Sequence, residues 1–160
     1  MNAENETQVA KAGDREIHIE RIFDAPRDRV FAAFVDPELI PDWWGPHGTT
    51  TIVEEMNVEV GGDWRFRTRS DEHGESVFRG TYREVGPPER LVQTFEWLGM
   101  PGHISVDSST FEDLGGRTKV TTVSQFHTPE ERDGMVDAGM ESGLSESYER
   151  LDALLAGDDG

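Results

Sequence analysis

The chain has 160 residues, with 15 lysines and arginines against 33 aspartates and glutamates, a formal net charge of −18 and no cysteine. This length fits a single domain with one core. The missing cysteines exclude disulfide scaffolds, thiol catalysis and cysteine-ligated metals, and the acidic balance argues against binding a nucleic-acid backbone.

The first part of the chain combines a polar segment, one strand and two short helices. Residues 1–14 lack hydrophobic periodicity and are predicted to be a disordered tail before one domain over residues 15–157. Alternation over residues 16–23 predicts a first strand. Ala25-Pro26 then opens a helix with apolar residues at helical spacing, and residues 38–44 are predicted to form a second, short helix.

The middle of the chain is rich in β-branched residues, alternating patterns and glycine turns. These features predict an antiparallel meander. The six strands expected in it cover residues 49–60, 63–70, 77–85, 91–98, 103–111 and 117–126.

The C-terminal segment predicts one long amphipathic helix. Thr128-Pro129-Glu130-Glu131 has the form of a capping box, with proline at the first helical position. Apolar residues then recur every three or four positions, at Val136, Met140, Leu144, Tyr148, Leu151 and Leu155. The helix is expected to run for roughly 25 residues. An α+β fold, in which a curved antiparallel sheet wraps around this helix, buries both apolar faces.

Six short motifs are similar to those of the SRPBCC (START-like) superfamily, in the branch that resembles the C-terminal domain of the activator of heat-shock-protein-90 ATPase. The motifs are Ala25-Pro26 through Phe31, Trp43-Trp44-Gly45-Pro46, Gly61 through Phe66, Gly80 through Val85 with Pro87 through Val92, Gly115 through Val120, and Gly139 through Leu144. The resemblance covers about residues 15–156. It implies a helix-grip (START-like, Bet v-like) fold with an apolar cavity under the C-terminal helix.

One position departs from the family pattern. Members commonly carry tryptophan after the helix glycine that corresponds to Gly143, where this chain has Leu144. The smaller side chain either enlarges the cavity or is a core exchange compensated elsewhere.

The residues predicted to line the cavity are the large apolar side chains of the short helix, the strands and the long helix. They are Trp43, Trp44, Trp64, Phe66, Phe78, Tyr82, Phe95, Trp97, Met140, Leu144 and Tyr148. Aromatic walls bury a large ligand area, and tyrosine hydroxyl or indole N–H groups can orient a ligand. Ordinary core packing is the alternative for each residue, and one of Trp43 and Trp44 is expected to face inward.

No other motif indicates a catalytic or metal site. The five histidines lack metal-ligand spacing, with His47 and His103 expected to be solvated, and no phosphate loop or G-x-S-x-G elbow is present. Arg65, Arg67 and Arg69 share one strand face and are expected to pair with acids across strands, or alternatively to contact an acidic partner.

We therefore predict non-enzymatic binding of an apolar small molecule or lipid, without a cofactor, a metal or a catalytic residue. The alternatives are co-chaperone-like stimulation of a chaperone ATPase, which rests on the resemblance, and a cyclase or hydrolase using the same cavity, which needs an inward ionisable group. The protein is expected to be cytoplasmic, to act as a monomer or homodimer, and to insert in no membrane, since the chain has no long apolar run.

The negative charge is unevenly distributed along the chain. Residues 128–160 hold ten acids against two arginines, whereas residues 57–90 hold seven acids against six arginines. The acid is therefore expected on the outside of the molecule and on the solvent side of the long helix. It reflects either adaptation to a salty cytoplasm or an arginine-favouring genome, and a specific acidic face for a partner is a less favoured third reading.

Overall fold

Eight strands and four helices make up residues 6–72 and 74–157, which the computed structural model of the chain describes. The strands are β1 (Gln8–Ala12), β2 (Glu16–Phe23), β3 (Thr50–Met56), β4 (Asp63–Ser70), β5 (Gly74–Gly86), β6 (Arg90–Trp97), β7 (Ile104–Asp113) and β8 (Thr118–Gln125). The helices are α1 (Arg27–Val35), α2 (Ile40–Trp43), α3 (Pro129–Asp137) and α4 (Met140–Gly157).

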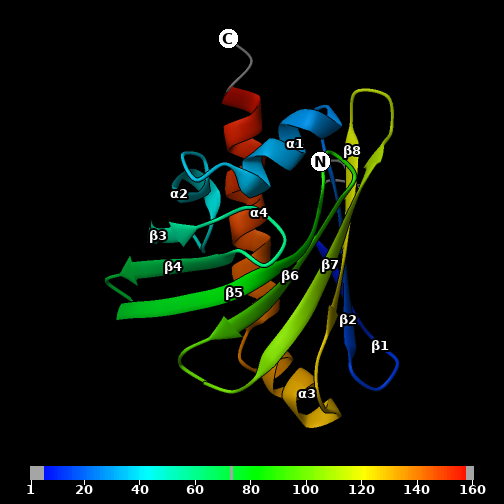
Figure 1. The fold of residues 1–160 in the computed structure, drawn as a ribbon. Helices are drawn as coiled ribbons and strands as arrows, with labels where there is room; N and C mark the ends of the chain where they lie inside the picture. Colours follow the sequence, from blue (N-terminus) through cyan, green and yellow to red (C-terminus); the bar gives the residue numbers. More distant parts are fainter. Residues whose placement is uncertain (1–5, 73, 158–160) are drawn as a thin grey trace.

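The strands form one antiparallel sheet in the order β1-β2-β8-β7-β6-β5-β4-β3. The sheet curves around α4, while α1 and α2 lie near the upper half of that helix and α3 lies below it (Figure 1). The predicted α+β helix-grip fold is confirmed. Each predicted strand of the meander is present, with small differences at the ends.

Alternation along β4 places its apolar side chains inside and its arginines outside. Arg65 Nε and Arg67 Nε donate to the carboxylate of Glu54 at 2.9 and 2.8 Å, and Arg67 and Arg69 both pair with Glu75. The prediction that these arginines pair with acids across strands is confirmed. The hydrogen bonds from the arginines lower the pKa of both glutamates.

The prediction of a disordered N-terminal tail is wrong for residues 8–12. These residues form β1, which pairs along the edge of β2 with Val9 opposite Ile19. The short strand carries weak alternation of its own, and it is held by backbone pairing to an edge that would otherwise be unpaired. Residues 1–5 lie outside the described residues.

The predicted single C-terminal helix is two helices. The capping box forms as expected, since Thr128 Oγ1 accepts from Glu131 N at 3.1 Å and the Glu131 carboxylate accepts from Thr128 N. The chain then breaks at Gly139, which adopts a φ of 88°. This left-handed conformation ends α3 and lets α4 start in a new direction.

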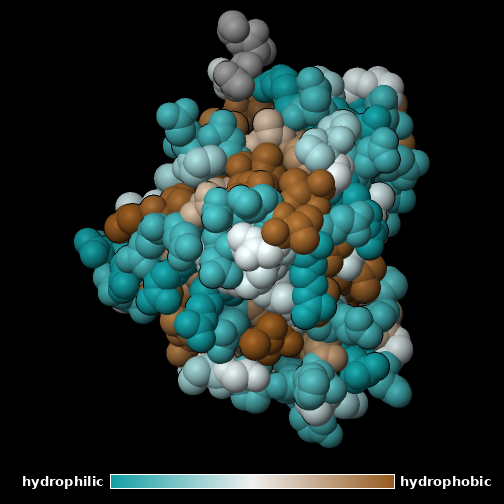
Figure 2. Space-filling view, in the orientation of Figure 1, coloured by the Kyte–Doolittle hydropathy of each residue, from teal (hydrophilic) through white to brown (hydrophobic). Residues whose placement is uncertain are grey.

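The face of the molecule seen in Figure 2 is mainly hydrophilic, with apolar residues in separate patches. The exposed large apolar side chains are Ile52, Val60, Ile104 and Leu114. Among the described residues, no helix combines the length and the apolar content that a membrane crossing requires.

Candidate functional site

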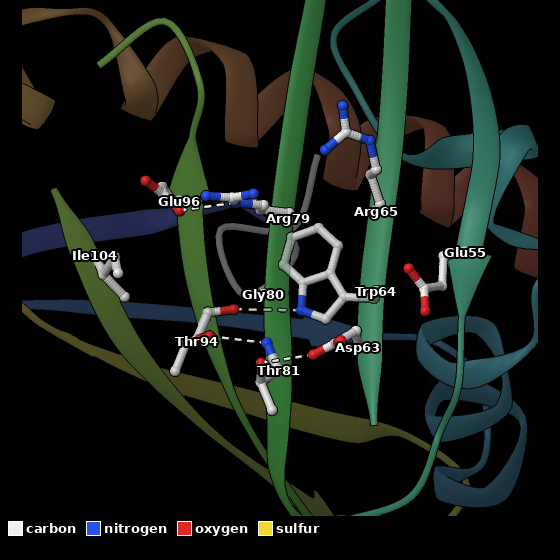
Figure 3. Close-up of a pocket in the computed structure, with 10 residues that line it drawn as sticks. All are labelled: Glu55, Asp63, Trp64, Arg65, Arg79, Gly80, Thr81, Thr94, Glu96 and Ile104. Atoms are coloured by element: carbon white, nitrogen blue, oxygen red, sulfur yellow. Dashed lines mark hydrogen bonds and ion pairs between the residues drawn. The ribbon is translucent and has the colours of Figure 1, made fainter. Parts of the chain in front are cut away.

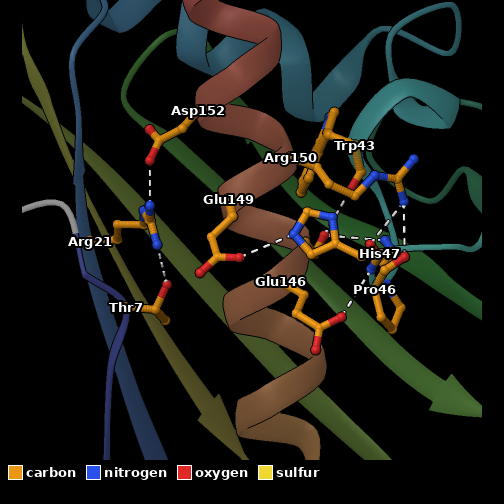
Figure 4. Close-up of polar contacts among 11 residues, drawn as sticks. Thr7, Arg21, Trp43, Pro46, His47, Glu146, Glu149, Arg150 and Asp152 are labelled. Carbon is orange, nitrogen blue, oxygen red and sulfur yellow. Dashed lines mark hydrogen bonds and ion pairs between the residues drawn. The ribbon is translucent and has the colours of Figure 1, made fainter.

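The segment that carries Trp43 and Trp44 is fastened to the middle of α4 (Figure 4). The Arg150 guanidinium donates to the carbonyl oxygens of Gly45 and Pro46 at 2.9 and 3.2 Å. Ser147 Oγ donates to the Trp43 carbonyl at 2.9 Å and accepts from Gly45 N at 3.2 Å. These bonds hold the segment of residues 43–46 against α4, and the aromatic rings on its two sides form two separate sets of ring contacts.

One end of the interior, here called the sealed end, is a network of rings and leucines around the C-terminal half of α4, and all of its members are buried except the half-buried Phe34. Its members are Phe23, Phe31, Phe34, Trp43, Phe111, Tyr148, Leu151 and Leu155. The ring of Phe34 lies 5.0 Å from that of Trp43 and 5.2 Å from that of Phe111. Trp43 and Tyr148 are 3% and 4% exposed, so this end is closed to solvent.

The other end, here called the open end, lies toward the N-terminal half of α4. Its members are Trp44, Trp64, Phe66, Phe78, Phe95, Met140 and Leu144, while Trp97 lies opposite Phe78 on β6 without belonging to this cluster. The ring of Phe78 lies 5.0 Å from that of Trp44 and 5.7 Å from that of Phe95. The described ring contacts link no member of this network to a ring of the sealed end.

The residues predicted to line a cavity are therefore divided by the structure. Trp43 and Tyr148 belong to the sealed end, and Trp64, Phe66 and Tyr82 are buried in the sheet. Burial raises the pKa of Tyr82. The half-buried residues are Trp44, Phe78, Phe95, Trp97, Met140 and Leu144.

A polar group on the inner face of the sheet, Asp107, is absent from the predicted site. Ser105 Oγ donates to Asp107 Oδ1 at 3.2 Å, and burial raises the pKa of this aspartate to about 6, against the opposing effect of the Ser124 and Ser105 hydroxyls. Phe111 marks the inward phase of β7, and period-two alternation from it reaches positions 109, 107 and 105. The alternation of β7 therefore indicates, from the sequence alone, that the side chain of Asp107 points inward.

A groove of about 320 Å³ lies on the outer face of the sheet, over β3 to β6 (Figure 3). The β5–β6 ladder is interrupted there, and the Trp64 indole N–H crosses Gly80 to donate to the Thr94 carbonyl at 3.2 Å. The Thr94 hydroxyl accepts from Thr81 N at 2.8 Å. The floor of this groove is therefore closed by internal hydrogen bonds.

A second depression, of about 510 Å³, lies at the junction of α3 and α4. It is lined by Val136, Gly139, Glu141, Ser142, Ser145 and Glu146. Its walls are surface side chains of two helices, so it offers few apolar contacts to a ligand.

Two exposed histidines, His47 and His103, pair with glutamates. His47 Nε2 lies 3.1 Å from the carboxylate of Glu149, and His103 contacts Glu131 at the start of α3. Both side chains are solvated, as predicted, with 56% and 44% of their surface exposed. Within the described residues, no group of three or more histidines and acids is arranged to hold a metal ion.

A protein-family model matches residues 24–156, which is most of the chain. The family is described as activator of Hsp90 ATPase homolog 1-like protein, abbreviated AHSA1. The chain belongs to this family, as the sequence motifs predicted. No curated protein sequence matches it at a significant level.

Solved structures agree with the fold of the AHSA1 family. The solution NMR structure of a protein from Arthrobacter aurescens is 26% identical, with a TM-score of 0.86 over 96% of this chain and 93% of that chain. A crystal structure from Rhodobacter sphaeroides is 24% identical, with a TM-score of 0.87 over 95% and 99% of the two chains. The AHSA1 protein from Silicibacter pomeroyi is 22% identical, with a TM-score of 0.72 over 88% and 97%.

Proposed function

We propose that this AHSA1 protein binds an apolar small molecule or a lipid between the sheet and the N-terminal half of α4. The observation that carries the proposal is the half-burial of apolar side chains from both layers at the open end. Phe78 and Phe95 extend from the sheet, and Met140 and Leu144 from the helix, yet none of the four is fully buried. Partly exposed apolar side chains gathered from two layers are typical of interaction sites.

The position of Leu144 supports this assignment. It lies one helical turn before Tyr148, which is buried at the sealed end, but it remains half-buried itself. The tryptophan that resemblance to the family leads us to expect here has a much larger side chain. We therefore infer that leucine at this position leaves space at the open end, as an enlarged cavity would require.

The test is to fill that space. N-phenyl-1-naphthylamine, a neutral fluorescent probe, is titrated into the wild type, into Leu144→Trp and into Ala153→Trp. Ala153 is exposed on α4, so its variant is a matched control that adds the same side chain outside the proposed site. We expect binding to the wild type and to Ala153→Trp, and a loss of about tenfold or more in Leu144→Trp through exclusion by the indole.

Thermal unfolding of each variant shows whether the fold is kept. Equal affinity in Leu144→Trp and the wild type, or no binding of the probe to the wild type, contradicts the proposal. Stimulation of a chaperone ATPase, which the family description suggests, would act through protein contact. It should therefore respond little to Leu144→Trp, and the same pair of variants separates the two functions.

A further inference from the structure

Asp107 lies between the two ends of the interior. It is on β7 opposite Gln93 of β6 and Ser124 of β8, and cross-strand partners point to the same face of a sheet. The next inward pair of β6 and β7 is Phe95 with Ser105. The carboxylate is therefore one step along the sheet from the rings of the open end.

The carboxylate is desolvated and yet retains accessible surface. Burial raises its pKa to about 6, but Asp107 is not among the fully buried residues. Asp107 is therefore a partly accessible acid on the inner face of the sheet, next to the Phe95–Ser105 pair of β6 and β7.

The groups around Asp107 leave its charge without a counterion. Ser105 and Ser124 supply hydroxyl groups from β7 and β8, and Gln93 supplies an amide from β6. Tyr148 approaches from α4, and its pKa is raised to about 12, mainly by burial and in smaller part by the charge of Asp107.

The inward cation of β2 is already used. The Arg21 side chain pairs with Asp152 of α4 and donates to Thr7 Oγ1 at 2.8 Å (Figure 4). Within the described part of the chain, Asp107 takes part in no ion pair.

We propose that Asp107 is the polar anchor of the binding site and selects a ligand that joins an apolar or aromatic body to one protonated amine. The body lies among Trp44, Phe78 and Phe95, and the ammonium group donates to the Asp107 carboxylate. This inference rests on the proposed binding function and names the ligand class for the same site. It involves no covalent step.

The charge of the protein favours an amine over other polar heads. A buried carboxylate gains most from a cationic donor, because a charged hydrogen bond in a poorly solvated site is stronger than a neutral one. A carboxylate ligand would place two like charges together, so a fatty acid is rejected. The net charge of −18 also attracts cations to the molecule.

Three compounds with the same ring test the proposal: 1-naphthylmethylamine, 1-naphthalenemethanol and 1-naphthoate. Each is titrated calorimetrically into the wild type, Asp107→Asn and Glu112→Gln. Glu112 is an exposed acid on the same strand, and its variant removes the same charge outside the site. We expect the wild type and Glu112→Gln to bind the amine about tenfold more tightly than the alcohol, with the acid weakest.

Asp107→Asn should bind the amine and the alcohol with about equal affinity. Its affinity for the alcohol should stay within about twofold of the wild-type value. The wild type gives a second test that needs no variant. Its preference for the amine should be present at about pH 8 and lost at about pH 5, where Asp107 is protonated and the amine remains charged.

The outcomes separate this inference from the binding function. If the alcohol binds and Leu144→Trp excludes it, but the amine is not preferred, the assignment of Asp107 is overturned and the binding function stands. If the preference for the amine survives in Asp107→Asn or is equal at both pH values, the assignment is also overturned. If none of the three compounds binds the wild type, both proposals fail.

Discussion

The two halves of α4 present the same kind of residue to the sheet but serve different purposes. Tyr148 and Leu151 in the C-terminal half are buried, whereas Met140 and Leu144 in the N-terminal half are half-buried. The difference shows that a helix with a continuous apolar stripe need not be a continuous part of the core. Its C-terminal half is part of the buried core, and its N-terminal half leaves the partly exposed apolar surface on which the proposed binding function rests.

Two adjacent tryptophans give the most direct test of this difference. Trp43 belongs to the sealed end and donates its indole N–H to the Ala33 carbonyl at 3.0 Å, while Trp44 belongs to the open end. Trp43→Ala should lower the free energy of unfolding by about 3–5 kcal/mol, because it leaves a closed cavity and an unpaired carbonyl. Trp44→Ala should cost about half as much, because Trp44 is half-buried.

Urea denaturation followed by circular dichroism measures both values. Titration of the fluorescent probe should rank the two variants in the opposite order, because Trp44→Ala should weaken probe binding more than Trp43→Ala does. Equal losses of stability in the two variants would mean that the two ends are one core.

Asp107 should be a cost to stability at neutral pH. Its pKa is raised by burial to about 6 in the folded protein, against an ordinary value near 3.8, so the folded state binds a proton more readily than the unfolded state. The free energy of unfolding should therefore fall as pH rises from about 4 to about 6. Asp107→Asn removes this cost and should stabilise the protein by about 2 kcal/mol at about pH 8.

The same variant should bring little gain at about pH 4, where the carboxyl of the folded wild type is already protonated and its burial no longer costs a charge. Chemical denaturation at the two pH values measures the difference. Glu112→Gln is again the control and should change stability by less than about 0.5 kcal/mol at either pH. A destabilised Asp107→Asn at about pH 8 would show that the carboxylate holds the two ends together rather than facing an internal space.

Local patterns predicted the strands and the family, because alternation and turn residues act over a few positions. They failed where a distant segment decides the structure. The segment 8–12 becomes a strand only because the edge of β2 is available to it. The helix break at Gly139 is hidden by an apolar stripe that continues across it.

The sequence named only some of the residues used in the proposed site, for a related reason. The prediction selected large aromatic residues, so it named half-buried Trp44, Phe78 and Phe95 together with buried residues such as Trp43. An aromatic residue type does not indicate how deeply its side chain is buried. Depth follows from which elements pack above each ring. Asp107 was not predicted as a site residue. The alternation of β7 indicates that its side chain points inward, but only apolar residues were considered when the inner face of that strand was assigned.

The sheet next to the open end is expected to be tightly packed at Gly80. A Cβ atom at Gly80 would lie 1.9 Å from the Thr94 carbonyl oxygen and 2.5 Å from the Trp64 indole nitrogen. Gly80→Ala should therefore displace the indole and lower the free energy of unfolding by about 1–3 kcal/mol. It should also weaken probe binding, because the rings of Trp64 and Trp44 are in contact.

Gly134→Ala is the matched control in α3, where an added Cβ meets no other atom within 4 Å. It should raise stability by about 0.5–1 kcal/mol, because alanine favours a helix over glycine. Urea midpoints of both variants measure the contrast. A Gly80→Ala protein as stable as the wild type would show that this part of the sheet adapts, and that the open end is loosely packed throughout.

The smallest expected effect concerns the acidic surface, which surrounds both ends alike. Exposed acids such as Glu130, Glu141 and Glu149 lie on the outer sides of α3 and α4, and the net charge of −18 repels itself in the folded state. If this surface is an adaptation to salt, the thermal midpoint should rise by about several degrees between low and molar KCl, because screening relieves the repulsion more than it weakens exposed ion pairs. The rise should be the same in Trp44→Ala as in the wild type, since salt acts outside the interior. A flat or falling midpoint would instead favour an arginine-favouring genome as the origin of the composition. A rise seen in only one of the two proteins would show that the acids affect the stability of one end more than that of the other.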